Sequence, residues 1–122
     1  MNTTMIRILV VDDEVPITRG LKRQLEATGR FEVQTENSGV AALKTARQFA
    51  PHVVLLDLMM PDLDGGQVKA QLTQMPACEK TLIIFLTALY QDTDTNDKDL
   101  FIAKPVDVEK IVHFIDQHLQ VE

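Results

Sequence analysis

The sequence predicts an α/β protein with a doubly wound, five-stranded parallel sheet and helices on both faces. Short segments rich in Val, Ile, Leu and Phe alternate along the chain with segments whose apolar residues recur every three or four positions. Strands that alternate with helices are joined by right-handed crossovers, which make the strands parallel. No repeat or linker interrupts the pattern, so residues 1–122 are expected to form one domain.

Five segments have the composition of buried strands: 6–11, 31–36, 52–57, 81–86 and 100–103. The third is unusual, because the aliphatic run 53–56 leads directly into Asp57. A run this apolar indicates a strand covered on both faces, where an unpaired carboxylate is costly. Asp57 therefore indicates a functional site.

Helical patterns fill the intervals after the first and second strands. The first has Pro16 in its initial turn, Gly29 as a C-terminal cap, and an inner face of Ile17, Leu21 and Leu25. The second is expected to begin at a cap, either Asn37 or Ser38, and must stop before Pro51. Its expected inner face carries Val40, Leu43 and Ala46.

Two further helices are expected after the third and fifth strands. One runs from about Gln67 to Met75 and ends before Pro76. The other begins after Asp107 and has the clearest helical periodicity, with Val108, Ile111, Val112, Ile115 and Leu119 on one face.

Two loops have distinct chemistry. In PDLDGG, residues 61–66, we interpret Asp62 and Asp64 as structural turn residues and expect Gly65 or Gly66 to adopt a positive φ. The segment 88–100 is polar and lacks an apolar stripe, so we expect a loop or short turn rather than a full helix. Its aspartates lack the Gly and Glu positions of a calcium-binding EF-hand loop.

Composition excludes several classes of function. A net charge of -6 and a pI near 5.0, with no long Lys/Arg cluster, argue against direct binding of nucleic acid. The N-terminal apolar stretch is too short for a signal peptide or a membrane span. The one cysteine, Cys78, fits a reducing compartment and is expected to be an inert thiol. We therefore expect a cytoplasmic protein that does not bind membranes.

Chemically reactive residues cluster where the predicted strands end. Asp12 and Asp13 follow the first strand, Asp57 ends the third, Thr87 follows the fourth and Lys104 follows the fifth. In doubly wound sheets, sites form at the carboxyl ends of strands. If these strands are neighbours, the five side chains converge.

Clustered carboxylates repel one another, and a shared cation relieves the repulsion. Oxygen-only donors favour Mg²⁺. A carboxylate can also attack a phosphoryl group and form an acyl phosphate. Mg²⁺, Lys104 and Thr87 could then each hold one phosphoryl oxygen.

Four motifs in order, VVDDE, LLDLMMPDLDG, FLTA and AKP, make the sequence similar to a receiver domain of two-component response regulators. The resemblance covers nearly the whole chain. It implies a flavodoxin-like sheet of order 2-1-3-4-5, with Asp57 as phosphoacceptor. Asp12, Asp13, Asp57 and the backbone carbonyl of Met59 would support Mg²⁺, while Thr87 and Lys104 would contact the phosphoryl group.

The resemblance also implies a switch and partners. Phe101 stands where the family has an aromatic switch residue, and without a hydroxyl group it would act with Thr87 through packing alone. A cis peptide is implied between Lys104 and Pro105. The phosphoryl donor would be a histidine kinase or a histidine phosphotransfer protein, and the output partner is unknown. The 88–100 segment is shorter than usual, so the family's usual output surface cannot be assumed.

Three other readings compete with a phosphorylation switch that assists its own phosphoryl transfer and dephosphorylation. A receiver-like interaction module without phosphorylation would have the same fold. An aspartyl-phosphate phosphatase of the haloacid dehalogenase type would need a second Asp at position 59, where this chain has Met59. A flavodoxin would need a phosphate-binding loop after the first strand, where acids stand instead.

Overall fold

The computed structural model describes residues 5–88 and 99–119, and its five strands form one parallel sheet of order β2-β1-β3-β4-β5. The predicted fold class and strand order are confirmed. The strands are β1 (Ile6–Val11), β2 (Phe31–Glu36), β3 (Val53–Asp57), β4 (Leu82–Thr87) and β5 (Leu100–Ala103). The helices are α1 (Val15–Ala27), α2 (Gly39–Phe49), α3 (Gly65–Leu72), the short 3₁₀ helix η1 (Pro76–Cys78) and α4 (Val108–His118).

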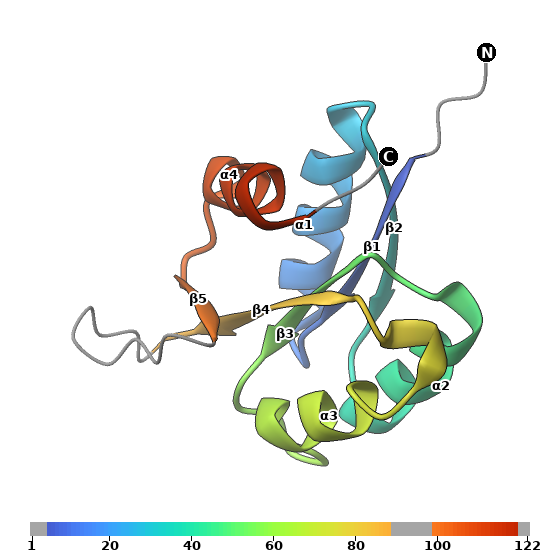
Figure 1. The fold of residues 1–122 in the computed structure, drawn as a ribbon. Helices are drawn as coiled ribbons and strands as arrows, with labels where there is room; N and C mark the ends of the chain where they lie inside the picture. Colours follow the sequence, from blue (N-terminus) through green and yellow to red (C-terminus); the bar gives the residue numbers. More distant parts are fainter. Residues whose placement is uncertain (1–4, 89–98, 120–122) are drawn as a thin grey trace.

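Helices cover the sheet on two sides, with α1 and α4 on one face and α2, α3 and η1 on the other (Figure 1). Successive residues of β1 alternate between the two cores: Ile8 packs with α1 and α4, and Leu9 packs with α2 and α3. All of β3 is buried. The uninterrupted apolar runs in the sequence follow from this burial on both faces.

The first two helices begin and end largely as predicted. Pro16 lies in the first turn of α1, and Gly29, just after its end, has φ 81°. Ser38 is the N-cap of α2, because its hydroxyl accepts a hydrogen bond from the Ala41 N–H at 3.0 Å.

The predicted inner face of α2 is wrong at one position. Val40 is 61% exposed, whereas the buried residues of the helix are Gly39, Ala42 and Ala46. At 100° per residue, two positions place Val40 nearly opposite Ala42 on the helix.

The helix α3 begins earlier and ends earlier than predicted. Asp64 is its N-cap and forms a reciprocal capping box with Gln67. After α3 ends, Pro76 opens η1, which the sequence analysis did not predict.

Asp62 also has a structural role, at another helix. Its carboxylate accepts hydrogen bonds from the Val40 N–H at 3.0 Å and the Gly39 N–H at 3.1 Å, at the start of α2. These backbone bonds lower the pKa of Asp62. These hydrogen bonds hold the loop after β3 against the N-terminus of α2.

Gly65 is required for a reason other than the one predicted. Neither Gly65 nor Gly66 has a positive φ; among the described residues, Gly29 and Ala50 do. A Cβ on Gly65 would lie 2.7 Å from the Asp57 carbonyl oxygen and 2.9 Å from the Leu58 Cα. The first turn of α3 therefore packs directly against the backbone at Asp57, and only glycine permits that approach.

We expect Gly65→Ala to lower the free energy of unfolding by about 1–3 kcal/mol, because the new methyl group forces backbone to move. Gly20→Ala is the matched control. Gly20 lies inside α1, and a Cβ there meets nothing within 4 Å. The control should gain up to about 1 kcal/mol from helix propensity. Urea unfolding followed by circular dichroism measures both, and equal stabilities for the two variants would refute the tight contact at Gly65.

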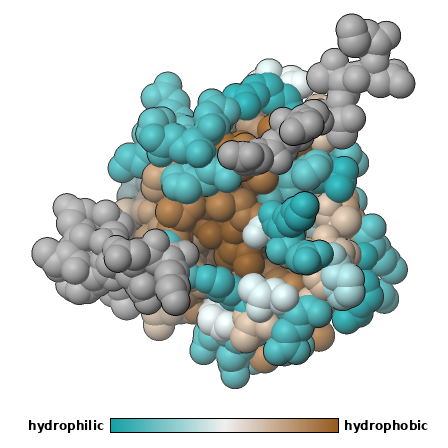
Figure 2. Space-filling model, viewed as in Figure 1, coloured by the Kyte–Doolittle hydropathy of each residue, from teal (hydrophilic) through white to brown (hydrophobic). Residues whose placement is uncertain are grey.

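Figure 2 shows hydrophobic side chains gathered at the centre of one face, between α4 and α3, with hydrophilic residues around them.

The prediction of a loop or short turn over 88–100 falls mainly on residues 89–98, which lie outside the described residues. Within the described ranges, no helix has both the length and the apolar character needed to cross a membrane.

Candidate functional site

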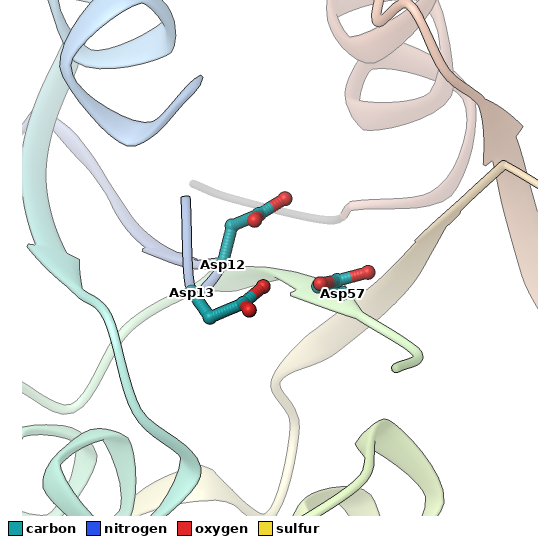
Figure 3. Close-up of side chains that lie close together, drawn as sticks. All are labelled: Asp12, Asp13 and Asp57. Atoms are coloured by element: carbon teal, nitrogen blue, oxygen red, sulfur yellow. The ribbon is translucent and has the colours of Figure 1, made fainter. Parts of the chain in front are cut away.

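Three acidic side chains meet at the carboxyl edge of the sheet (Figure 3). Asp12 and Asp13 directly follow β1, and Asp57 is the last residue of β3. Because β1 and β3 are neighbours in the sheet, these ends lie side by side. Each residue offers one carboxylate oxygen, and the three oxygens lie within 4.8 Å of one another. The cluster expected from the sequence is thus assembled by the strand order.

The three carboxylates differ in exposure. Asp12 is fully buried and Asp57 is 5% exposed, whereas Asp13 is exposed. One oxygen of Asp12, Oδ1, accepts a hydrogen bond from the Glu14 N–H at 2.9 Å. The other, Oδ2, is buried without a hydrogen bond of good geometry and faces the ammonium group of Lys104 at 2.9 Å.

Lys104 brings the positive charge into this cluster. Its backbone N–H donates to the Thr87 carbonyl at 2.9 Å, which continues the pairing of β5 with β4. Its Nζ lies 3.3 Å from Asp57 Oδ1 and 3.8 Å from Glu14 Oε1. Burial acts to lower the pKa of Lys104, but the bond to Asp12 and the charges of Asp12 and Asp57 raise it overall. The Lys104–Pro105 peptide bond is cis.

The carboxylate of Asp57 is held in an unfavourable setting for a charge. Burial first, and then the charge of Asp12, raise the pKa of Asp57, while Lys104 and the Met59 N–H oppose this rise. That N–H donates to Asp57 Oδ1 at 3.4 Å, a long hydrogen bond. The raised pKa means that the folded protein holds a proton on Asp57 more tightly than the unfolded chain does. Ionised Asp57 therefore weakens the fold above that pKa, and the cost disappears as pH falls.

In the absence of divalent metal at pH 7, we expect Asp57→Asn to raise the free energy of unfolding. The substitution removes a buried carboxylate that Asp12 repels, and Lys104 keeps Asp12 as its partner at 2.9 Å. Added Mg²⁺ should reduce the difference in free energy of unfolding between the two proteins, because Mg²⁺ binding stabilises the wild type. Asp62→Asn, on the same loop, should instead destabilise, because the pKa of Asp62 is lowered by the backbone N–H groups it caps. Urea unfolding of the wild type and both variants, once with chelator and once with Mg²⁺, measures these three effects. An Asp57→Asn protein that is less stable than the wild type in the presence of chelator would contradict the account.

Thr87 and Phe101 lie on adjoining strands. Thr87 is the last residue of β4, is 5% exposed, and pairs with Ala103 of β5. Phe101 is half-buried and stacks on Phe85 with ring centroids 5.5 Å apart. Phe85 and Phe101 are register partners, so the same pairing that sets Thr87 beside β5 also sets this stack.

An open depression of about 770 Å³ lies beside the acidic cluster. Asp13 and Met59 line it, together with Leu58, Met60, Pro61, Asp64 and Gly66. The side chain of Met59 is 68% exposed. The depression leaves this edge of the sheet open to solvent.

The sequence analysis missed two features of the site. Glu14 faces Lys104, and the signal for it was its position directly after the acidic pair. The ring of Phe85 stacks on Phe101 and also lies 5.6 Å from the ammonium of Lys69 on α3. No local pattern marks Phe85, because its role depends on the register of β4 with β5.

The arrangement fits a small divalent cation. Its donors are oxygens, it lacks a His or Cys ligand among the described residues, and the buried Oδ2 of Asp12 is short of hydrogen bonds. Mg²⁺ typically takes one or two carboxylates and keeps several waters, and the exposed side of Asp13 leaves room for them. With a carboxylate at the strand end and a lysine 3.3 Å away, the site has the parts needed for phosphoryl transfer to an aspartate.

The fold and this site define a class of signalling protein, and the chain's similarity to known proteins identifies the same class. The chain belongs to the response regulator receiver domain family, whose model matches residues 8–116. Receivers act in two-component signalling and generally bind Mg²⁺ at an acidic pocket.

Among relatives, Protein PilH of Pseudomonas aeruginosa is 36% identical over 91% of this chain and 95% of that protein. The DNA-binding dual master transcriptional regulator RpaA of Synechocystis is 33% identical over 88% of this chain but only 46% of its own length. The chain thus spans nearly all of one relative and less than half of the other. The solved structure of Vibrio cholerae CheY4 has a TM-score of 0.85, with 23% identity, and covers 95% of this chain and 100% of that one. This last likeness shows the fold.

Proposed function

We propose that Asp57 of this receiver accepts a phosphoryl group from a phosphohistidine, carried by a histidine kinase or a histidine phosphotransfer protein. The observation that carries the proposal is the position of Asp57. Its carboxylate ends the fully buried β3, lies beside two other acids, and has Lys104 Nζ at 3.3 Å. Family membership supports the signalling role.

In the proposed reaction, a carboxylate oxygen of Asp57 forms a bond to phosphorus while the P–N bond of the phosphohistidine breaks. The bonding pair leaves with the imidazole, and Asp57 becomes an acyl phosphate. Lys104 exchanges its contact with the Asp57 carboxylate for one with a phosphoryl oxygen. The Thr87 hydroxyl, at the same edge of the sheet, donates to another.

Asp12, Asp13, Asp57 and the Met59 carbonyl would hold Mg²⁺, which supplies positive charge against the phosphoryl oxygens. Buried Asp12 keeps Lys104 in place, and exposed Asp13 offers the most accessible carboxylate. The same groups assist hydrolysis of the acyl phosphate, so the protein promotes its own dephosphorylation without turning over an external substrate.

The site offers less to a phosphatase mechanism. A haloacid dehalogenase type of enzyme needs an acid two residues after the nucleophile, and the exposed thioether of Met59 stands there. A thioether cannot transfer a proton, so Asp57 is better suited to accept and store a phosphoryl group.

The switch proposed for this chain uses packing rather than a hydroxyl hydrogen bond. Thr87 moves toward the phosphoryl group, and Phe101 adjusts its stack on Phe85, two residues before Thr87 on β4. This movement alters the surface near β5 that an output partner or output domain reads. Several relatives are longer than this chain, so the output is left open.

The donor approaches the carboxyl edge beside α1. A groove of about 240 Å³ borders Lys104 there and is lined by Pro16, Ile17, Gly20, Leu21, Gln24, Pro105 and Val106. These mostly apolar residues offer a packing surface next to Lys104, whose ammonium group lies 3.3 Å from Asp57. Receivers typically meet their kinases in the cytoplasm, where we also place this chain.

Incubation with phosphoramidate and Mg²⁺ tests the chemistry, because this small molecule has the P–N bond of a phosphohistidine. We expect the intact mass to increase by one phosphoryl group, and hydroxylamine to remove it, as it does from acyl phosphates. No gain in the presence of excess chelator would show the need for metal. A phosphorylated product that resists hydroxylamine would place the group on a hydroxyl and refute the proposal.

A further inference from the structure

Asp13 is the one acid of the cluster whose own side chain is not held in place. Its carboxylate makes no hydrogen bond or ion pair with any other residue that the structure describes. By contrast, Asp12 is bound by the Glu14 N–H and Lys104, and Asp57 by Lys104 and the Met59 N–H. The direction of the Asp13 side chain therefore depends on the backbone that carries it.

That backbone is fixed from the neighbouring loop by Asn37. The Asn37 side-chain amide, Nδ2, donates to the Asp12 carbonyl oxygen at 2.8 Å and to the Thr18 hydroxyl at 3.1 Å. The Asp12 carbonyl and the Asp13 N–H belong to one planar peptide unit. A bond to the carbonyl thus fixes the plane from which Asp13 departs.

The other end of the bridge is rigid. Thr18 is 1% exposed in α1, and its hydroxyl donates to the Val15 carbonyl at 3.1 Å. Asn37 directly follows β2, which pairs with β1 along its whole length up to the pair Val11 and Glu36. The amide therefore joins two loops that the sheet already places side by side, and it is not the N-cap of α2, because Ser38 has that role.

We propose that Asn37 is a positioning residue for the metal site, which orients Asp13 toward Mg²⁺ through the Asp12–Asp13 peptide. This inference rests on the proposed function, because it takes the acidic cluster to be the Mg²⁺ site. Loss of an outer partner of a metal ligand typically weakens metal affinity by about 10- to 100-fold. Asn37 touches the backbone rather than the ligand, so the lower end of that range, about tenfold, is expected for Asn37→Ala.

Calorimetric titration of the whole chain with MgCl₂ tests the proposal with three variants. Asn37→Ala should bind Mg²⁺ about tenfold more weakly than the wild type. Asn37→Asp has the same shape but cannot donate to the Asp12 carbonyl. Its extra negative charge would strengthen Mg²⁺ binding if charge alone mattered, whereas positioning predicts weaker binding. Ser38→Ala, the matched control, removes the adjacent cap of α2 and should bind as the wild type does.

A second readout separates positioning from damage to the fold. With phosphoramidate as donor, Asn37→Ala should need about tenfold more Mg²⁺ for half-maximal phosphorylation, while its rate at saturating Mg²⁺ stays that of the wild type. Wild-type Mg²⁺ affinity in Asn37→Ala, tighter binding in Asn37→Asp, or an equal loss in Ser38→Ala would each overturn the inference. A wild type that binds Mg²⁺ but gains no phosphoryl group would refute the proposed function alone and leave the calorimetric test of Asn37 valid.

Discussion

The Asp57→Asn protein is expected to gain no phosphoryl group when it is incubated with phosphoramidate and Mg²⁺, whereas the wild type gains one. An amide is a far weaker nucleophile than a carboxylate, so the bond to phosphorus cannot form at this position. The substitution preserves shape, and the raised pKa of Asp57 indicates that the fold tolerates a neutral group there. Intact-mass spectrometry measures the outcome directly.

Asp62→Asn is the matched control, because Asp62 lies on the same loop but caps α2. It should be phosphorylated like the wild type. Equal phosphorylation of the Asp57→Asn protein and the wild type would show that the acceptor is another residue.

The second large effect concerns the metal. Asp13→Ala is expected to lower the affinity for Mg²⁺ on the order of a hundredfold, more than the loss of an outer partner such as Asn37. Asp13 is the exposed carboxylate of the cluster, and its oxygen lies within 4.8 Å of those of Asp12 and Asp57. The remaining two acids already share Lys104, so they cannot replace it fully.

A double substitution of Asp94 and Asp97 by asparagine controls for overall negative charge. It removes two acids from the polar segment before β5 and should leave Mg²⁺ affinity close to that of the wild type. Calorimetric titration of the Asp13→Ala protein and the double variant with MgCl₂ shows which of the two loses more Mg²⁺ affinity. A larger loss in the double variant than in Asp13→Ala would place the metal site away from the carboxyl edge of the sheet.

Much of this architecture could be predicted because burial leaves a local trace in the sequence. Strands covered on both faces are apolar over most of their length, and β3 shows this in residues 53–56. Asp57 stands out against that background, and parallel strands place their carboxyl ends at one edge. Asp12, Asp13, Asp57 and Lys104 could therefore be assigned to one cluster before any distance was known.

Other features depend on close contacts between segments that are distant in sequence. Gly65 looked like a turn glycine, but its role is to let α3 approach the Asp57 carbonyl. Val40 looked like a core residue, and it is exposed because α2 turns its alanines inward. Asn37 looked like a possible helix cap, and its amide reaches Asp12 instead. A sequence pattern describes one element at a time, so contacts of this kind are not visible in it.

Chemical mapping of the phosphorylated residue tests the central claim most directly. Borohydride reduces an acyl phosphate of aspartate to homoserine, and peptide mass spectrometry then locates the change in the chain. After incubation with phosphoramidate and Mg²⁺, the account predicts homoserine at position 57 and at no other position. Homoserine at Asp12 or Asp13, or a phosphoryl group that survives on a Ser, Thr or His, would contradict the assignment of Asp57 as the phosphoacceptor.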